Sequence, residues 1–419
     1  MWKNKQGGKI DNVQEKTSRE NVEILMRIIT LNASEMKSFN RRRILEHLRI
    51  QSTSRAELSR VTGLTRSAIS LIVDGLLQDG ILREGCEQGG RVGRKSVILD
   101  INPGAFYSIG LSITPDDYAV GLVDFGGTIQ RRVSKPIDSH IPVREVLACI
   151  GADIDALLLE HPLPGRLLGM GITAPGPLDT KRGIILRSPG FEKWSDLPIV
   201  EFFSNRVSGA ILLENHANAL ALAEKTFCLK GAYESFIEIV VDTGVGAGLI
   251  IEGDLYKGGT GFGNEFGHAS INMNGPRCSC GNYGCAELYA SIPNLLAALS
   301  EKNPELDSWA QIADLSKSGN PAACEALERE AEYLAGIIVN AVNILDVEAV
   351  VLSGDIAYHA DELNDKITRK VNDRFMGREN RQIKILASLL TGHPATLSSA
   401  NLALENYVRL GEPRIDGFL

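Results

Sequence analysis

Three of the seven cysteines lie within the eight-residue stretch CSCGNYGC, and a histidine precedes this stretch by ten residues. One imidazole and three thiolates make a complete tetrahedral set, the preferred surroundings of a structural zinc ion. Two glycines inside the stretch allow the chain to wrap tightly around an ion. Free buried cysteines and a redox pair are the alternatives. The spacing favours zinc, and the predicted ligands are His268, Cys278, Cys280 and Cys285.

Length and composition set the context for this cluster. A chain of 419 residues with 44% hydrophobic and 23% charged residues has material for two or three domains. The first twenty residues have no apolar core of the kind a secretory signal requires. The apolar run VEILMRIITL is too short to span a bilayer. We therefore expect a cytoplasmic protein, without membrane partners, in which clustered cysteines bind metal more often than they form disulfides.

Charge is distributed unevenly along the chain. Residues 37–96 contain twelve Lys and Arg against six Asp and Glu, although the whole chain carries a net charge of −8. A basic segment joined to an acidic body indicates that one part of the protein meets nucleic acid and the other does not.

The basic segment has the pattern of a helix-turn-helix. Amphipathic helical stretches are predicted at 39–50, 54–63 and 65–82. Ser54 is a candidate N-cap, with Glu57 three residues later in the spacing of a capping box. Gly63 then ends the helix, and Thr65 can cap the next one. A short helix, a glycine-containing turn and a second helix predict insertion of the second helix into a DNA major groove.

A Gly/Arg loop follows these helices. The stretch GGRVGRK lies between two strand-like segments, which is the arrangement of the wing in a winged helix. A solvated basic surface is the alternative interpretation. The predicted DNA-binding residues are Thr65, Arg66, Ser67, Ser70, Arg91, Arg94 and Lys95.

The acidic body has an alternating α/β pattern that occurs twice. Three strand-like segments at 107–114, 118–125 and 129–137 precede a helical run at 143–161 and a further strand at 167–176. A similar order begins again at 236. Two α/β lobes of related layout, with a cleft between them, are the predicted architecture. The glycine-rich loop DTGVGAG at 242–248 could approach a phosphate or a sugar, although tight β-turns use glycine just as often.

The zinc loop and its surroundings resemble the signature of the ROK family (repressors, open reading frames and sugar kinases). The matching elements are E-x-G-H, from Glu265 to His268, and C-x-C-G-x-x-G-C-x-E, from Cys278 to Glu287. The stretches GITAPGPLD (171–179) and DTGVGAG are also similar to family motifs.

This resemblance, over residues 40–410, implies an α/β, two-lobed, actin/hexokinase-like body. The expected organisation is an N-terminal extension (1–36), a winged helix-turn-helix domain (37–102), lobe 1 (103–228) and lobe 2 (229–419). The C-terminal helix is expected to return to lobe 1, and the chain to form a homodimer or tetramer. The fused winged helix is a feature of the family's repressor branch.

The resemblance also implies a sugar in the cleft. One nitrogen of His268 would bind zinc while the other faces a sugar hydroxyl, and two glutamates would accept hydrogen bonds from neighbouring hydroxyls. Solvated glutamates without a ligand are the alternative. The expected sugar-binding residues are Asn215, His216, Glu265, His268 and Glu287.

Three departures from the family's kinases argue against catalysis. The kinases use an aspartate after an asparagine as base, whereas His216 follows Asn215 here. The first phosphate loop is replaced by GLSITP, in which Pro115 removes an N–H. Gly190 stands where a sugar-contacting asparagine is common, so the sugar stays open.

The sequence therefore predicts a non-enzymatic, sugar-responsive repressor of carbohydrate-utilisation genes, whose affinity for operator DNA falls when sugar binds. A ROK sugar kinase with an accessory DNA-binding domain is the alternative. A zinc-stabilised structural protein without ligand is a third possibility.

Overall fold

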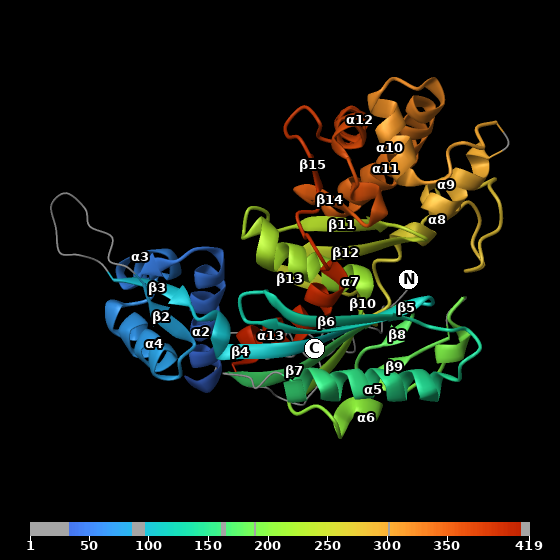
Figure 1. Ribbon diagram of the computed structural model, residues 1–419. Coiled ribbons are helices and arrows are strands. Elements are labelled where there is room, and N and C mark those ends of the chain that lie inside the picture. The colour runs from blue at the N-terminus through green and yellow to red at the C-terminus, as the bar shows by residue number, and fades with distance from the viewer. Residues whose placement is uncertain (1–32, 86–96, 161–164, 188–189, 301, 412–419) are drawn as a thin grey trace, which may run out of the picture.

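The computed structural model describes residues 33–85, 97–160, 165–187, 190–300 and 302–411. These residues form a small helical domain beside two stacked α/β lobes (Figure 1). Among them, no helix combines the length and the apolar character needed to cross a membrane. The sequence-based prediction of fold class is confirmed.

The small domain is a helix-turn-helix with a short three-stranded sheet. Its elements are α2 (Ala33–Ile50), β1 (Thr53–Ser54), α3 (Arg55–Thr62), α4 (Arg66–Gln78), β2 (Leu82–Glu84) and β3 (Ile98–Ile101). The strands pair in the order β1-β3-β2, and both pairs are antiparallel. The segment between β2 and β3 contains Arg91, Arg94 and Lys95, which lie outside the described residues, as do residues 1–32 of the N-terminal extension.

Side-chain caps fix the turn between α3 and α4. Ser54 Oγ accepts a hydrogen bond from the Glu57 amide at 3.3 Å, and Thr65 Oγ1 accepts one from the Ala68 amide at 3.2 Å. Gly63 ends α3 in the left-handed region at φ 69°. The predicted caps are confirmed, but only half of the capping box forms. The Glu57 carboxylate binds Arg60 at 2.9 Å instead of returning to the helix start.

The two lobes are built on five-stranded sheets of the same topology. In each, three antiparallel strands in sequence are followed by two parallel strands on the other side of the first. Lobe 1 has the order β10-β7-β4-β5-β6, from β4 (Phe106–Ile113), β5 (Asp117–Asp124), β6 (Ile129–Pro136), β7 (Arg166–Ala174) and β10 (Ala210–Asn215). Lobe 2 has the order β13-β12-β11-β14-β15, from β11 (Phe236–Val241), β12 (Val245–Ile251), β13 (Asp254–Tyr256), β14 (Ala349–Ser353) and β15 (Lys384–Ala387). The second α/β unit expected from the sequence is therefore present.

Helices cover the outer faces of both sheets and fill the space between them (Figure 1). Lobe 1 packs its apolar outer face against α5 (Val143–Glu160) and α6 (Ile199–Ser204). Lobe 2 carries α8 (Glu287–Ala290), α9 (Ile292–Leu299), α10 (Trp309–Lys317), α11 (Pro321–Leu345) and α12 (Asp361–Asn372). Between the sheets lie α7 (His216–Ala223) and α13 (Pro394–Leu410).

Helix α13 lies against the lobe 1 sheet through a row of three glycines. Gly110 in β4 pairs with Gly121 in β5 on one side and with Gly171 in β7 on the other. A Cβ atom on Gly171 would overlap the Ser399 carbonyl oxygen of α13, and one on Gly110 would overlap that of Thr396. The helix backbone therefore rests directly on the sheet, at a distance that side chains at these positions would prevent.

Hydroxyl groups complete this contact. Ser108 Oγ donates to the Ala400 carbonyl oxygen at 2.8 Å, and Thr173 Oγ1 lies 2.7 Å from Ser399 Oγ. All four residues are buried, so these hydrogen bonds satisfy polar atoms that water cannot reach.

Helix α13 also holds the helix-turn-helix domain. Arg49 of α2 donates to Glu405 of α13 at 2.8 Å, and its guanidinium lies between the rings of Phe125 and Phe227 at 5.7 and 5.6 Å. Burial acts to raise the pKa of Glu405. The positive charges of Lys225 and Arg49 outweigh this effect and lower the pKa to about 2. An apolar core runs through the same junction and contains Leu45, Leu48, Phe106, Phe125 and Leu404. The small domain is thus packed on lobe 1 and not loosely tethered.

The glycine row makes a prediction about stability. We expect Gly171→Ala to lower the free energy of unfolding by roughly 3 kcal/mol or more, because the added methyl group forces α13 away from the sheet. Gly336→Ala in α11 is the matched control, since a Cβ there meets nothing within 4 Å. That change should be neutral or stabilising by about 0.5–1 kcal/mol. Urea unfolding followed by circular dichroism measures the free energy of unfolding of both variants. Equal changes in the two would contradict direct packing of the α13 backbone on the sheet.

Candidate functional site

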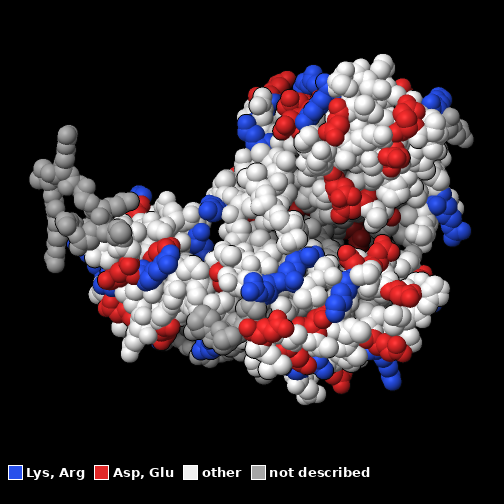
Figure 2. Space-filling view, viewed as in Figure 1, with Lys and Arg blue, Asp and Glu red and all other residues white. Residues whose placement is uncertain are grey.

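A pocket lies between the two lobes. It is lined by parts of residues 176–180 and 214–218 on the lobe 1 side, and of 246–247 and 261–265 on the lobe 2 side. The surface is hollowed between the lobes, with acidic side chains around the opening on the face shown in Figure 2. The cleft predicted from the duplicated α/β pattern is therefore present and accessible.

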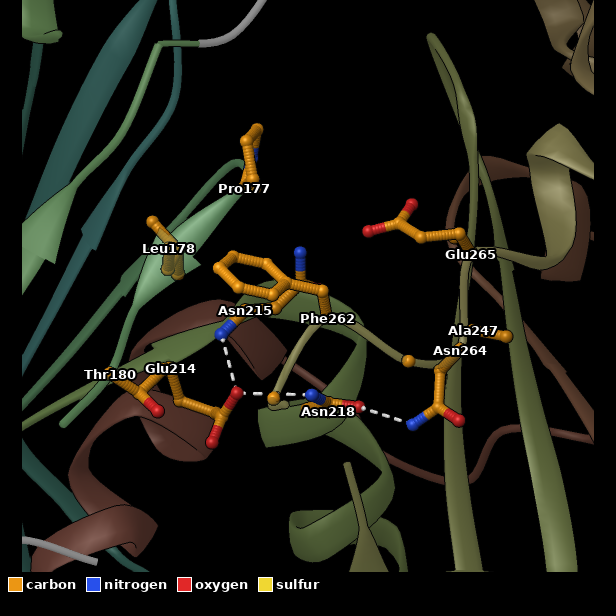
Figure 3. Close-up of a pocket in the computed structure, with 14 residues that line it drawn as sticks. Pro177, Leu178, Thr180, Glu214, Asn215, Asn218, Ala247, Phe262, Asn264 and Glu265 are labelled. Carbon is orange, nitrogen blue, oxygen red and sulfur yellow. Dashed lines mark hydrogen bonds between the residues drawn. The ribbon is translucent and has the colours of Figure 1, made fainter. Parts of the chain in front are cut away.

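A polar network forms the floor of this pocket. The Glu214 side chain is buried, and it accepts hydrogen bonds from Asn218 Nδ2 at 3.0 Å and from Lys257 Nζ at 3.0 Å. Asn218 Oδ1 in turn accepts from Asn264 Nδ2 at 3.2 Å (Figure 3). Lys257 and Asn264 belong to lobe 2, so this network joins the lobes where a ligand would sit. A carboxylate that is already satisfied in this way is a fixed acceptor, not a free base.

Two of the expected sugar-binding residues line the pocket. Asn215 and Glu265 approach it from opposite sides, and the Glu265 carboxylate points toward the centre (Figure 3). Asn215 Oδ1 caps α7 by accepting from the Ala217 amide at 2.9 Å, while the Asn215 amide nitrogen faces Gly176. A hydrogen-bond donor and a carboxylate acceptor thus face each other across a space between the lobes, which is suitable for hydroxyl groups of a small polar ligand.

His216 does not line the pocket. Its Nε2 lies 2.9 Å from the Ile113 carbonyl oxygen, which requires the N–H on that nitrogen. Burial lowers the pKa of His216 from its ordinary value, so the ring is neutral at pH 7. This bond ties the start of α7 to the end of β4. His216 therefore acts in this structure as a tie between two elements.

The turn after β4 is closed on itself. Thr114 Oγ1 accepts from the Asp117 amide at 3.0 Å and donates to the Asp117 carboxylate at 2.8 Å. The groups that a phosphate would need are engaged within the turn, where the sequence also places Pro115. This local geometry agrees with the interpretation that the turn lacks a phosphate-binding role.

His268 and Glu287 lie behind Glu265 rather than in the pocket lining. Burial raises the pKa of Glu265, the His268 ring lowers it and the Glu287 carboxylate raises it, so all three groups are within electrostatic reach of one another. Glu287 Oε2 accepts from the Val245 amide at 3.1 Å, inside the glycine-rich loop at 242–248. The structure thus brings His268 and Glu287 close to Glu265, which itself lines the cleft.

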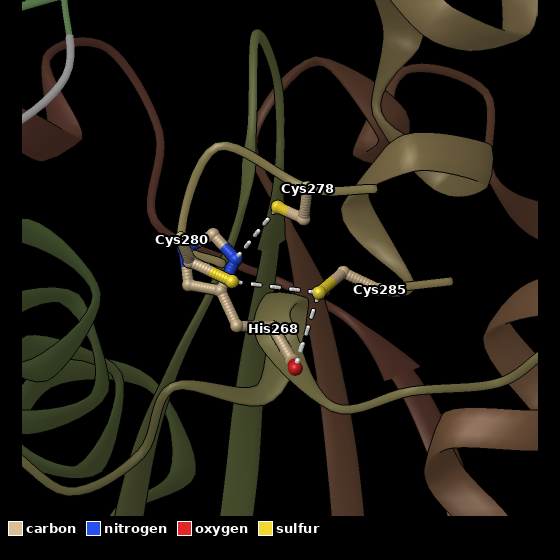
Figure 4. A group of neighbouring side chains, drawn as sticks. All are labelled: His268, Cys278, Cys280 and Cys285. Atoms are coloured by element: carbon tan, nitrogen blue, oxygen red, sulfur yellow. Dashed lines mark hydrogen bonds between the residues drawn. The ribbon is translucent and has the colours of Figure 1, made fainter. Parts of the chain in front are cut away.

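The four predicted metal ligands form one cluster (Figure 4). Their candidate ligand atoms all lie within 4.8 Å of one another, with Cys280 Sγ 3.7 Å from Cys285 Sγ and Cys278 Sγ 3.7 Å from His268 Nδ1. Tetrahedral coordination with metal–sulfur bonds of about 2.3 Å requires sulfur atoms about 3.8 Å apart. The residues present therefore fit a metal ion, and Nδ1 is the nitrogen of His268 that faces it.

The electrostatics of the thiols agree with this fit. Burial raises the pKa of Cys278, but the Cys280 amide and the neighbouring thiols that donate to its sulfur lower the pKa to about 7. Burial and the neighbouring sulfurs raise the pKa of Cys285 to about 12. Several thiolates cannot accumulate here without a cation to compensate their charge.

The described DNA-binding candidates lie at the start of α4. Arg66 and Ser67 are exposed, and the hydroxyls of Thr65 and Ser67 are 3.1 Å apart. Ser70 follows one turn later and is half-buried. These side chains surround a helix N-terminus, whose free amides and positive dipole favour a phosphate.

Sequence reasoning missed Glu214, Asn218 and Lys257. Glu214 lies in strand β10 and Asn218 lies in α7, so no helical spacing connects them, and their nearness to Asn215 in sequence was the only local signal. Lys257 comes from a distant hairpin, so no local pattern connects it with Glu214.

Comparisons with known proteins agree with this geometry. The sequence model that describes the ROK family matches residues 108–406 of this chain. The chain is 32% identical to a xylose repressor of Bacillus spizizenii over 376 residues, which is 89% of this chain and 97% of the repressor.

Two solved structures resemble the fold. A ROK family transcriptional regulator, a homologue of the Escherichia coli Mlc protein, superposes with a TM-score of 0.75 at 23% identity, covering 89% of this chain and 97% of the regulator. A ROK glucokinase from Streptomyces griseus in complex with glucose and AMPPNP superposes with a TM-score of 0.62 at 26% identity, over 71% of this chain and 99% of the kinase. The extent of the family match, together with the repressor that aligns along nearly its whole length, shows that this chain belongs to the ROK family.

Proposed function

We propose that the protein is a sugar-responsive transcriptional repressor that binds operator DNA through α3 and α4 and a sugar between its lobes. The observation that carries this proposal is the rigid attachment of the helix-turn-helix domain to a ROK body with an open interlobe pocket. The similarity to a xylose repressor along 89% of this chain supports it.

The sugar contacts Asn215 and Glu265 across the pocket in this proposal. His268 and Glu287 complete the wall behind Glu265, and His216 keeps α7 in position. The experiment is a two-step selection. Full-length protein first enriches operator sequences from a random DNA duplex library, and xylose, glucose and related sugars are then screened by thermal shift and by their effect on the selected DNA.

The metal in this proposal is zinc, held by His268, Cys278, Cys280 and Cys285. A zinc ion bound to His268 Nδ1 leaves the Nε2–H as a donor of fixed orientation. The same ion fixes the loop that carries the Cys280–Cys285 turn, next to Glu287. Zinc therefore acts as a structural support for one wall of the sugar pocket.

This assignment predicts the metal content and its consequence. Freshly purified protein should contain one equivalent of zinc per chain, and Cys280→Ser should lose most of it because three ligands bind zinc far more weakly than four. Loss of zinc from Cys280→Ser should also weaken sugar binding. Cys324→Ser is the control, since Cys324 lies in α11 outside the cluster. Elemental analysis that finds no zinc in the wild type, or full content in Cys280→Ser, would contradict the assignment.

The proposal excludes sugar kinase activity. A neutral His216 tied to Ile113 is not an anionic base, and the turn at Thr114 is closed by its own hydrogen bonds. We expect no sugar-dependent ATP turnover by the wild type, and none after His216→Asp alone, because one substitution does not rebuild the phosphate loop. A coupled ATPase assay over the sugar panel measures this. Sugar-dependent turnover by the wild type would establish an enzyme.

The body contacts the helix-turn-helix domain from both lobes, which provides a route for coupling. Helix α2 is bonded to α13 on the lobe 1 side through Arg49, while Arg42 Nη2 binds Asp254 of β13 in lobe 2 at 2.9 Å. Closure of the lobes over a sugar would move Asp254 of lobe 2 relative to α13. Because α2 is bonded to both, its position on the body would change. Helix α4, which enters the major groove in this proposal, then tilts relative to its DNA site. This tilt lowers operator affinity.

We predict that sugar weakens operator binding by roughly 1–3 kcal/mol and that Asp254→Asn removes a measurable part of this coupling. Operator affinity without sugar should change little, since Asp254 is exposed and belongs to lobe 2 rather than to α3 or α4. Asp155→Asn removes a comparable exposed partner, bound to Arg206 at 2.8 Å within lobe 1, and should leave the coupling intact. Operator titrations at fixed salt, with and without sugar, measure the operator affinity and the coupling for each variant. Tighter operator binding with sugar would reverse the proposed sign.

A further inference from the structure

Helix α4 carries a large apolar side chain that is mostly exposed to water. Leu71 is 76% exposed, the most exposed of the large apolar side chains in the described part of the helix-turn-helix domain. The apolar face of α4, formed by Ile69, Val73 and Leu76, is buried in the domain core. Leu71 therefore contributes little to folding, and most of its apolar surface is available to a partner.

The position of Leu71 is that of a base-reading residue. It lies four residues after Ser67, so these two side chains share the outer face of α4, and Arg66 precedes Ser67 at the helix start. The hydroxyls of Thr65 and Ser67 and the helix N-terminus are placed to bind a phosphate. Leu71 comes one turn after Ser67 on the same face, within the N-terminal half of the second helix, which is the part that contacts base edges in helix-turn-helix proteins.

The charges around Leu71 also suit DNA. The first turn of α4, which is described throughout, contains no acidic side chain. Asp74 follows Leu71 on the outer face, but Arg55 Nη2 binds the Asp74 carboxylate at 2.8 Å and compensates its charge. An apolar side chain flanked by hydroxyls, a helix N-terminus and a neutralised carboxylate is complementary to a major groove and not to a second apolar protein surface.

We infer that Leu71 is a specificity-determining residue that contacts the 5-methyl group of a thymine in the operator major groove. This inference rests on the proposed DNA-binding function. Thymine presents the only apolar group that a base shows in that groove, so an aliphatic side chain gains by burying it. At a base with a polar edge in the same position, Leu71 would displace the water that is hydrogen-bonded to that edge and would offer no hydrogen bond in its place.

The test combines a change in the protein with a change in one DNA group. Full-length wild type and Leu71→Ala are titrated with an operator duplex obtained by selection from a random library, in which each thymine of one half-site is replaced in turn by uracil. Uracil lacks only the methyl group. At one position, the replacement should weaken wild-type binding about fourfold, the effect of exposing one methyl-sized group.

Leu71→Ala should bind the thymine and uracil duplexes equally at that position, and it should bind the thymine duplex about fourfold or more weakly than the wild type does. Leu159→Ala in α5, which removes a side chain that is 83% exposed in lobe 1, is the matched control and should behave as wild type. Equal sensitivity to uracil in wild type and Leu71→Ala, or unchanged operator affinity of Leu71→Ala, would overturn the inference while DNA binding itself stands. If the wild type enriches no sequence, the proposed function fails instead.

Discussion

The arrangement of the whole molecule depends on the direct contact between α13 and the lobe 1 sheet. Gly110, Gly121 and Gly171 lie side by side on three paired strands. Helix α13 approaches so closely that its carbonyl oxygens stand against Gly110 and Gly171, and the Thr396 methyl group stands against Gly121. The last helix of the chain follows a lobe 2 strand and yet is anchored in lobe 1. A side chain in this row would displace α13, and with it the surface on which the helix-turn-helix domain packs.

Helix α7 makes the corresponding exchange in the other direction. It follows a lobe 1 strand and packs against β12 of lobe 2, where a Cβ on Gly248 would overlap the Ala217 carbonyl oxygen. The two crossing helices therefore lie between sheets of the same topology, and each links one lobe to the other. The pocket opens at the start of α7, and the domain that would meet DNA is fixed to the end of α13. The two helices between the sheets thus connect the elements that line the pocket with the surface on which that domain packs.

The polar groups divide into those that hold the structure and those that remain available to a ligand. Glu214 and His216 are engaged with Lys257 and Ile113, and both are partly or wholly buried. Glu265, by contrast, projects into the pocket with a pKa raised by partial burial, so it gains from a partner that donates a hydrogen bond. This division separates a residue suited to binding a sugar from residues that support the site.

Residues close together in the chain specify the local elements. The caps at Ser54 and Thr65, the repeated strand order and the tight spacing from His268 to Cys285 all depend on neighbouring residues, and periodicity or motif spacing reports them directly. Only the tertiary structure decided which distant residues meet. The alignment of Gly110 with Gly171, the pairing of Glu214 with Lys257, the tie from His216 to Ile113 and the exposure of Leu71 each depend on strand register or domain packing. One chain offers no local signal for such contacts, because they are fixed by the way whole elements pack and not by the residues beside them in sequence.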